Sequence, residues 1–376
     1  MKLTKLMLSA SVAALALVSC NKMDTVPEVA KRLKTVEVSL ENIALTKGAA
    51  GNKIEAGDAV LLKDFQIFLT DASGNEYTAK IADGSKDAQT YWSSADLSTG
   101  AIEAAFHYVD PNCTKVVAVA NIGKMLTFAE YKALEALKIE DQQNQASLSL
   151  YDEKELKLAS GQHSDLNVNG TTYVADVYKA DLVLTPRISR FEVDGFTVKF
   201  NSEPKYNEIT VTQLAFQNYY PTTSLLTGVE SGTLVNHITN LTDQAEVYNW
   251  LDNPEKPEAW FRDYFDITIT PDAATKDTPA PLAYHMFSNT EAPVMVIKLL
   301  ADDQPAYLYS KGFYKADGTP VTNFEEGKIY RMSAKGEVEN DGSIPIDEDD
   351  IDPMDRCLEI TVDVVEWAVE LVYPEF

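Results

Sequence analysis

Residues 35–45 read TVEVSLENIAL, and the interpretation of the whole chain starts from them. Val36, Val38 and Leu40 alternate with polar residues, which is the period-2 pattern of a half-buried β-strand. The residues that follow are small, polar and rich in glycine, and they predict a flexible, exposed loop. Lys47 lies in this loop and offers a site for proteolysis. The chain therefore begins with a strand that one cut can detach.

The residues before this strand predict export. Residues 1–19 combine two lysines, an apolar run and small residues, as in a secretory signal peptide, and the run is too short for a spanning helix. They end in Leu-Val-Ser followed by Cys20, which resembles the lipobox of bacterial lipoproteins, whose cysteine carries palmitate. We expect residues 20–47 to be a lipidated propeptide that holds the removable strand. The alternative is a buried cysteine after an ordinary signal peptide.

The composition favours an exported, acidic, all-β protein. The net charge is -26, and loss of residues 1–47 would take it to -29, because seven basic and four acidic residues would leave. A chain of this charge is repelled by nucleic acid and by anionic lipid headgroups. Apolar residues make up 45% of the chain, which is enough for the cores of two domains.

The pattern along the chain predicts two β-sandwich domains in tandem, with a few short helices. We place the N-terminal domain at residues 48–182 and the C-terminal domain at 183–376, with the boundary near Ala180–Pro186. Thr127 and Glu130 form a capping box at the start of one helix, whose apolar repeat extends to Leu137. Strands are expected over residues 60–69, 77–81, 101–109, 113–121, 173–184, 187–193, 196–200, 209–216, 267–270, 294–299, 307–313 and 328–334.

The C-terminus predicts a last strand that lacks a return connection. Residues 340–353 are acidic and bounded by prolines, which is typical of a solvated linker. Residues 358–376 alternate again, but the apolar phase switches at Val364–Val365, which predicts a bulge or a bend. Such a terminal strand is tucked into its own sheet or is donated to a neighbour. The large apolar residues of its second half are Val365, Trp367, Val369, Leu371 and Tyr373.

Motifs for catalysis, metals or cofactors are weak, and we expect no enzyme, no cofactor and no metal site. Residues 160–165 (SGQHSD) contain triad residue types, but in one local polar loop, whereas active triads join distant segments. The acidic run 347–352 lacks the glycine and the spacing of a calcium loop. The aromatic residues of 250–265 could stack on a sugar, although core packing explains them better. A disulfide between Cys113 and Cys357 stays open.

In order, these segments resemble the fimbrillins, the lipoprotein-derived pilins of Bacteroidales. The similar features are the lipobox at Cys20, the first strand before a basic site, the valine run that ends in Ala120-Asn121, the arginine-led segment 187–191 and the valine–tryptophan segment 362–367. One departure is Lys47, because the best-known members carry arginine at the cut. Arg32 and Lys34 are therefore alternative cleavage sites.

The resemblance implies tandem transthyretin-like, Greek-key sandwiches and a structural subunit, the shaft pilin of an adhesive fimbria. It implies a precursor at the outer membrane, a trypsin-like surface protease, loss of the strand with Val36, Val38 and Leu40, and filling of the gap by the C-terminal strand of another subunit. The implied partners are other copies, tip and anchor subunits and a host or bacterial surface ligand, with no nucleic acid. The alternatives are a tip or anchor subunit and a monomeric glycan-binding surface lipoprotein.

Overall fold

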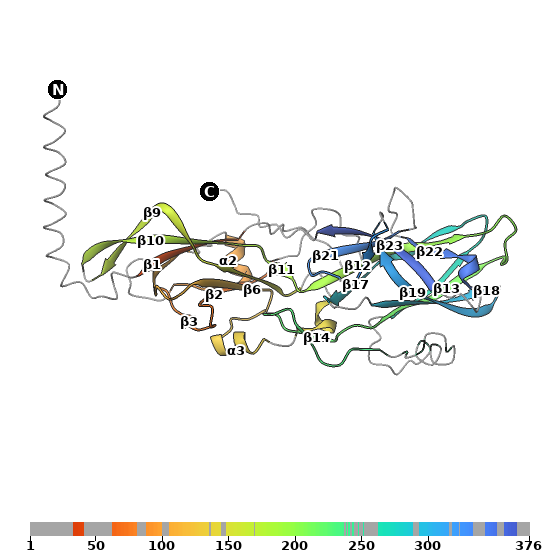
Figure 1. Cartoon of the computed structure of the whole chain (residues 1–376), viewed down its shortest axis with the longest axis horizontal. Helices are drawn as coiled ribbons and strands as arrows, with labels where there is room; N and C mark the ends of the chain where they lie inside the picture. Colours follow the sequence, from red (N-terminus) through yellow and green to blue (C-terminus); the bar gives the residue numbers. More distant parts are fainter. Residues whose placement is uncertain are drawn as a thin grey trace, which may run out of the picture.

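The protein is elongated, with two β-rich lobes placed end to end (Figure 1). As predicted, it is an all-β fold with short helices. The computed structural model describes residues 33–40, 62–80, 88–99, 105–134, 137–143, 148–168, 170–236, 262–288, 293–315, 318–322, 324–333, 343–351 and 357–366, together with 238, 240, 243, 247 and 251. Among these residues, no helix is long and apolar enough to cross a membrane.

The N-terminal lobe is built from two sheets that share one core. The first sheet contains, in order, β5 (Ala105–Val109), β1 (Lys34–Leu40), β10 (Thr171–Leu182) and β9 (Lys157–Val168). The second contains β11 (Thr185–Pro186), β8 (Leu150–Glu155), β6 (Lys115–Ala120), β2 (Phe65–Thr70) and β3 (Glu76–Tyr77), with β4 (Tyr91–Trp92) beside β2. Val36 and Phe106 of the first sheet lie in the same buried cluster as Ile67 and Val116 of the second.

The valine-rich strand β6 is central in its sheet, between β8 and β2, as the sequence predicted, and both of its faces are buried. Val116 and Ala118 face the core between the sheets, whereas Val117 and Val119 belong to a second cluster on the outer face. The short helix α3 (Phe128–Lys132) covers that outer face, and its Tyr131 ring stacks on Phe68 with 4.3 Å between centroids. A second helix, α2 (Ser94–Thr99), follows β4.

The predicted capping box is present, but the helix is shorter than expected. The backbone N–H of Glu130 donates to the hydroxyl of Thr127 at 3.2 Å, and the Thr127 N–H donates to the Glu130 carboxylate at 2.8 Å. The helix ends at Lys132, and Leu137 instead begins the two-residue strand β7 (Leu137–Lys138). Pairing of β7 with a distant segment overrides the local helical repeat.

The segment 160–165, predicted to be a polar loop, is part of the long strand β9, so that prediction was wrong. β9 pairs with β10 in an antiparallel ladder that extends beyond the sandwich. Most of its side chains are exposed on both faces, so the apolar alternation that marks a strand is missing. His163 lies opposite Asp176 on β10, with 3.3 Å between Nδ1 and Oδ1, and both side chains are exposed.

The C-terminal lobe is one ten-stranded sheet that folds over its own core. Along the sheet run β16 (Arg262–Ile269), β13 (Ile209–Gln217), β18 (Val294–Ala301), β19 (Gln304–Tyr314), β23 (Cys357–Glu366), β21 (Lys328–Ser333), β12 (Ile188–Lys199) and β17 (Thr275–Phe287), with β20 (Pro320–Val321) beside β19 and β22 (Ser343–Asp347) beside β12. Phe191 of β12 and Phe216 of β13 are far apart along the sheet, yet their rings lie 5.7 Å apart.

The acidic segment near the C-terminus is structured, which corrects the predicted solvated linker. Residues 343–347 form β22, which pairs in parallel with β12, and Glu348 begins the 3-10 helix η5 (Glu348–Ile351). The Glu348 carboxylate is fully buried and accepts the backbone N–H groups of Asn201 at 2.6 Å and Lys205 at 2.9 Å. These two hydrogen bonds join η5 to the segment that follows β12.

The predicted bulge at Val364–Val365 is absent. β23 pairs with β21 in a continuous antiparallel register from Ser333 opposite Thr361 to Lys328 opposite Glu366. The irregularity lies instead in the parallel ladder with β19, between Ser310 and Gly312. The strand continues in one ladder because β21 runs beside it past the phase switch. Two further differences are β12, which is one strand where two were expected, and β17, which was not predicted.

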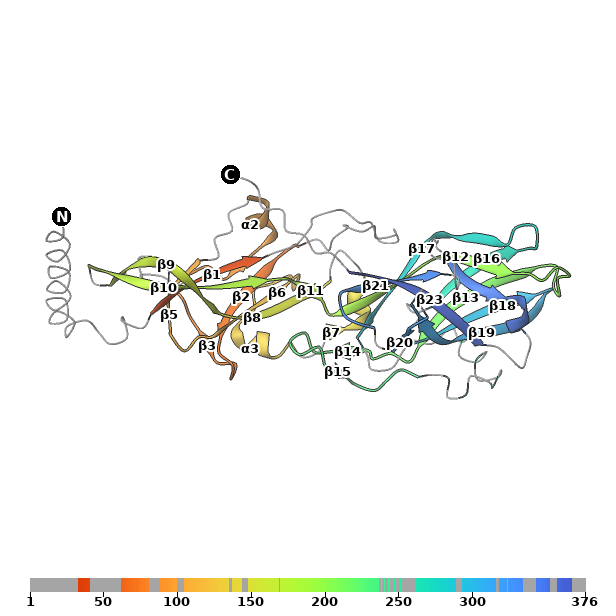
Figure 2. The same cartoon turned by 45° about the horizontal axis from the view of Figure 1, so that its top comes forward.

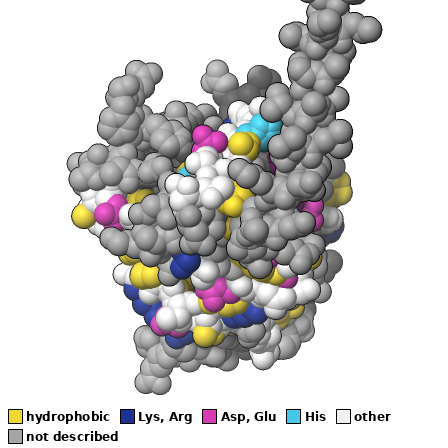
Figure 3. All heavy atoms as spheres, turned by 90° about the vertical axis from the view of Figure 1, so that its left-hand side faces the viewer, with side chains coloured by type: hydrophobic (Ala, Val, Ile, Leu, Met, Phe, Trp, Pro, Cys, Tyr) yellow, Lys and Arg dark blue, Asp and Glu magenta, His cyan; other side chains and the backbone are white. Residues whose placement is uncertain are grey.

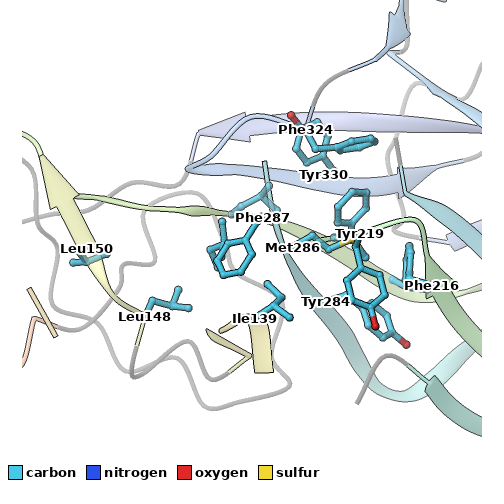
Figure 4. Packing of buried hydrophobic residues seen from close by; sticks show 14 of the residues in the cluster. Ile139, Leu148, Leu150, Phe216, Tyr219, Tyr284, Met286, Phe287, Phe324 and Tyr330 are labelled. Atoms are coloured by element: carbon cyan, nitrogen blue, oxygen red, sulfur yellow. The ribbon is translucent and has the colours of Figure 1, made fainter. Parts of the chain in front are cut away.

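Buried residues of the two lobes form one core where the lobes meet. Some residues that follow the expected domain boundary pair with strands of the first lobe. The chain after β13 returns to the first lobe, where β14 (Thr222–Thr223) pairs with β7 on one side and β15 (Glu230–Ser231) on the other. Figure 4 shows Ile139, the first residue of the 3-10 helix η2 (Ile139–Gln142), and Leu148 next to Phe287 of β17. Arg187 lies over the Tyr151 ring and donates to the Leu225 carbonyl.

A buried polar network extends from the second lobe to this junction. Glu192 accepts the Nε–H of Arg190 and of Arg331, each at 2.8 Å. Arg190 also donates to His285 Nε2 at 2.9 Å, and His285 Nδ1 donates to the Gln142 carbonyl at 2.6 Å. Because an arginine only donates and a carbonyl only accepts, the histidine is neutral with its proton on Nδ1. Burial, and then the charge of Arg190, lower the pKa of His285 to about 3.

This network predicts acid sensitivity. In the unfolded chain His285 binds a proton near its ordinary pKa of about 6.5, whereas in the folded protein it stays neutral down to about 3. The free energy of unfolding should therefore fall by up to about 1.4 kcal/mol per pH unit as the pH drops from 6.5 towards 3. Denaturant unfolding at pH 7 and pH 4 measures this, with His285→Gln as the control. An equal pH dependence in both proteins would contradict the assignment.

Candidate functional site at the first strand

β1 occupies an internal position in the first sheet of the N-terminal lobe, beside β10 (Figure 2). It pairs in parallel with β10, from Thr35 opposite Val177 to Leu40 opposite Leu182. On its other side it pairs antiparallel with β5, where Val36 lies opposite Phe106. The strand was predicted from its alternation, and the structure confirms it.

The apolar face of β1 completes the core of the lobe. Val36 is fully buried and Val38 is 9% exposed. Both belong to the cluster that contains Phe106 and Val109 of β5 and Ala180 of β10. Burial of each valine is worth roughly 1.5–3 kcal/mol. If β1 were removed, β5 and β10 would each have unpaired backbone groups and the core would open to solvent.

The outward face of β1 is held by polar contacts to its neighbours. Thr35 Oγ1 lies 3.1 Å from His107 Nδ1 and also contacts the hydroxyl of Ser164 on β9. Glu37 forms an ion pair with Lys179 of β10, with 3.0 Å between Oε2 and Nζ. Ser39 donates to the carboxylate of Asp181, two residues further along β10. These contacts fix one register of the strand in its place.

Lys34, the first residue of β1, has a buried side chain. Its ammonium donates to the carbonyl oxygens of Pro111, at 3.3 Å, and Cys113, and it lies 4.4 Å from the centre of the Tyr178 ring. Burial lowers its pKa, while the nearby Cys113 and Asp110 oppose that shift. With 5% of its surface exposed, Lys34 is shielded from a protease in this folded form.

The structure describes some of the predicted site residues, in β1 and β23, and leaves others outside its described part. Val36, Val38 and Lys34 are in β1, and Leu40 is its last residue. Val365 lies in β23, opposite Ile329 of its own sheet, so this part of the expected donor strand is already paired. The remaining predicted residues lie outside the described part of the chain: Cys20, Arg32, Lys47, Trp367, Val369, Leu371 and Tyr373.

Sequence reasoning missed the polar contacts of β1. Lys179 and Asp181 lie at alternate positions of β10, so they share a face, but only the parallel register brings them beside Glu37 and Ser39. The alternation of residues 173–184 predicted the strand β10. It did not predict which strand pairs with β10. The position of the Lys34 ammonium depends on the loop between β5 and β6, and no pattern in the sequence predicts that contact.

Within the described residues, the other candidate sites are not brought together. In the described part of the chain, no group of three or more His, Cys, Asp or Glu side chains is placed to hold a metal ion. Cys113 is a buried free thiol, so it is not bridged to Cys357. Of the aromatic run 250–265, Tyr264 is exposed and Phe265 contacts the Phe196 ring, while Trp250, Trp260 and Phe261 lie outside the described residues.

The described histidines are equally separate. His107 contacts Thr35, His163 faces Asp176 and His285 is buried at the lobe junction, while His237 lies outside the described residues. Figure 3 views the molecule from the end of the N-terminal lobe, where coloured hydrophobic, acidic and basic side chains are interspersed. One arrangement that the described residues do form is a strand held in a slot between β5 and β10.

Comparison with known proteins gives a fold. No protein-family model and no curated protein sequence matches the chain. Among solved structures it is similar to a fimbrilin (fimA) from Porphyromonas gingivalis W83, with a TM-score of 0.50, 13% identity and coverage of 90% of this chain and 99% of that chain. For a "putative cell adhesion protein" from Bacteroides eggerthii the values are 0.47, 12%, 90% and 97%.

A third similar structure is the tip fimbrial protein Mfa3 from Porphyromonas gingivalis, with a TM-score of 0.37, 9% identity and coverage of 89% of this chain and 100% of that chain. The neighbours are thus fimbrillins and adhesion proteins of Bacteroidales, at low sequence identity. The likeness that carries weight is the one to the fimbrilin, and it covers both lobes. The chain has the fimbrillin fold that its sequence motifs resemble.

Proposed function

We propose that this protein is a shaft subunit of an adhesive fimbria on the cell surface and that it polymerises by donor-strand exchange. The observation that carries the proposal is the position of β1. It is an internal strand of the N-terminal lobe, yet it comes first in the described chain and is joined to β2 through residues 41–61. A strand at this point can leave without breaking the connection between any other two strands.

The processing steps follow from where the basic residues lie around β1. The precursor is exported, carries palmitate on Cys20 and reaches the outer membrane. A trypsin-like surface protease then cuts after Lys47, beyond the end of β1 at Leu40. A cut after Arg32 would free the lipid but leave β1 in the chain, and Lys34 is buried. Of the three candidate sites Arg32, Lys34 and Lys47, Lys47 is therefore the one whose cleavage separates β1 from the rest of the protein.

The open slot is then filled by the C-terminus of another copy. Since β23 is paired with β21 through Glu366, and with β19 as far as Thr361, we assign the donated segment to residues 367–376. Ladder hydrogen bonds supply affinity and alternate side chains supply the register. Burial of four large apolar side chains supplies on the order of 10 kcal/mol before ordering costs. A head-to-tail contact of this kind does not close on itself, so it generates a filament.

Limited trypsin digestion, followed by intact mass and gel mobility, tests the proposal. We expect one early cut after Lys47, loss of the β1 peptide and a ladder of heat-labile multimers. In a Lys53→Ala background, which removes the other lysine of the loop, Lys47→Ala should lack both the cut and the ladder, because β1 then stays in its slot. Lys63→Ala is the matched control, since it removes a lysine beyond the loop and should polymerise normally.

The same experiment separates the alternatives. Resistance to cutting would favour an anchor subunit that keeps its lipid, and a clean cut that yields only monomer would favour a glycan-binding surface lipoprotein. Multimers formed by uncut protein would rule out the proposed role of β1. In the fibre, the partners are further copies of this chain together with tip and anchor subunits, and the adhesive target is a host or bacterial surface ligand.

A further inference from the structure

We infer that the donated segment enters the slot in a single register, in which Glu370 of the incoming copy takes the place of Glu37 opposite Lys179. The inference rests on the proposed function and assigns Lys179 as its register-determining residue. It follows from three features of the molecule: the cation that β1 leaves behind, the sequence of the C-terminal segment, and the pairing of β23.

The first feature is the environment of Lys179. In the parallel ladder it lies opposite Glu37, and the two side chains form an ion pair across the strands. On its other side it lies opposite Lys157 of β9. Departure of β1 therefore removes the carboxylate and leaves Lys179 beside another cation. An incoming strand with an acid at this position restores the lost pairing, whereas one with a basic residue is repelled.

The second feature is a match between the two strands. Val36-Glu37-Val38 of β1 corresponds to Val369-Glu370-Leu371 of the C-terminal segment, with apolar residues on both sides of an outward acid. In this register Tyr373 falls at the place of Leu40. Pro374, which has no N–H for a ladder, falls just beyond the end of β1.

The same register also places a suitable residue at the position of Lys34. Trp367 falls at this position, where the Lys34 ammonium donates to two backbone carbonyls and lies over the Tyr178 ring. An indole supplies an N–H donor and an aromatic face in one side chain. The C-terminal segment contains no lysine or arginine after Glu366, so no cation can take this position, and in this register Trp367 supplies the donor there.

The third feature excludes the neighbouring registers. A shift of two residues keeps the apolar face inward but places Ala368 or Val372 opposite Lys179, without a charge. A shift of four places Glu366 there, and a larger shift places Asp363 there. Both residues are already paired with β21, opposite Lys328 and Arg331, so these registers require part of β23 to leave its own sheet.

A disulfide trap tests the register directly. Neighbouring strands lie about 4.8 Å apart, which is within the Cα separation that a disulfide spans. In full-length Lys179→Cys, Glu370→Cys protein, cut at the loop and oxidised, we expect multimers that survive heating until a reductant is added. Lys179→Cys, Ala368→Cys is the matched control, and Lys179→Cys, Asp363→Cys tests withdrawal of β23. Trapping in either of these, with none at Glu370, would overturn the inference.

A charge exchange tests the role of Lys179 itself. We expect Lys179→Glu and Glu370→Lys each to slow multimer growth about fivefold, and the double variant to recover the wild-type rate. Lys47→Arg and an arginine-specific protease are used throughout, so that the lysine introduced at position 370 is not cut. Lys276→Glu, an equal charge change on an exposed site of β17, should grow normally.

The outcomes distinguish the inference from the proposed function. Normal growth of both single variants, or no recovery in the double variant, would overturn the role of Lys179 while strand exchange stands. If wild-type protein cut at Lys47 forms no multimers at all, both the inference and the proposed function fail.

Discussion

Deletion of residues 367–376 is expected to leave a folded protein that is cut normally but no longer forms multimers. The physical reason is that β23 ends at Glu366 and keeps its ladders with β19 and β21, so the C-terminal lobe retains its sheet. The donated segment is gone, so the slot of the next subunit stays empty. Gel mobility after cutting measures multimer formation, and circular dichroism on heating measures folding.

Deletion of residues 357–376 should have a different result. β23 is the strand that joins β19 to β21 in the sheet. Its loss therefore splits the ten-stranded sheet of the lobe into two parts. We expect the C-terminal lobe to unfold or aggregate. If the shorter deletion also unfolds the protein, residues 367–376 are part of the lobe and the monomeric lipoprotein is favoured. If the shorter deletion still polymerises, the donor is another segment.

Val36→Ala together with Val38→Ala is expected to destabilise the uncut protein strongly and the fibre hardly at all. Both valines lie on the buried face of β1, so the double change should lower the free energy of unfolding of the N-terminal lobe by about 3 kcal/mol. Under the proposed strand exchange β1 is replaced in the fibre, so the same residues would no longer be part of the structure. No other outcome separates a removable strand from a permanent one so directly.

Thermal unfolding of the uncut protein and thermal dissociation of multimers measure the two effects. For a lobe of this size the midpoint of the uncut protein should fall by roughly 6–12 °C, while the dissociation temperature of multimers stays unchanged. Val174→Ala is the matched control, because Val174 lies on the neighbouring strand β10 but is 67% exposed. A parallel loss in the multimers would mean that β1 remains in the fibre.

Most strands could be predicted because half-buried strands alternate. β1, β2, β6, β10, β13, β18, β19 and β21 lie where apolar residues recur at every second position or run without interruption. The capping box at Thr127 was equally local, because its two hydrogen bonds join residues three apart. In each of these cases the signal and the structure involve the same few residues.

The failures have a different origin. β9 is exposed on both faces, so it lacks apolar alternation, and its partner β10 holds it in place. The segment 343–351 was predicted to belong to a solvated linker, yet β22 pairs with β12 and Glu348 of η5 accepts two N–H groups from residues about 145 positions earlier. Neither feature is visible in a short stretch of sequence, because its stabilising contacts are made with distant segments.

The sequence by itself determined that the chain is all-β, that residues 35–40 form a half-buried strand and that another strand lies near the C-terminus. These are properties of local periodicity, and periodicity is written in neighbouring residues. Only the tertiary structure decided that β1 lies between β5 and β10, that Lys34 is buried while Glu37 meets Lys179, and that β23 is paired through Glu366. Pairing and register join residues far apart in the chain, and alternation alone does not specify which strand lies beside which.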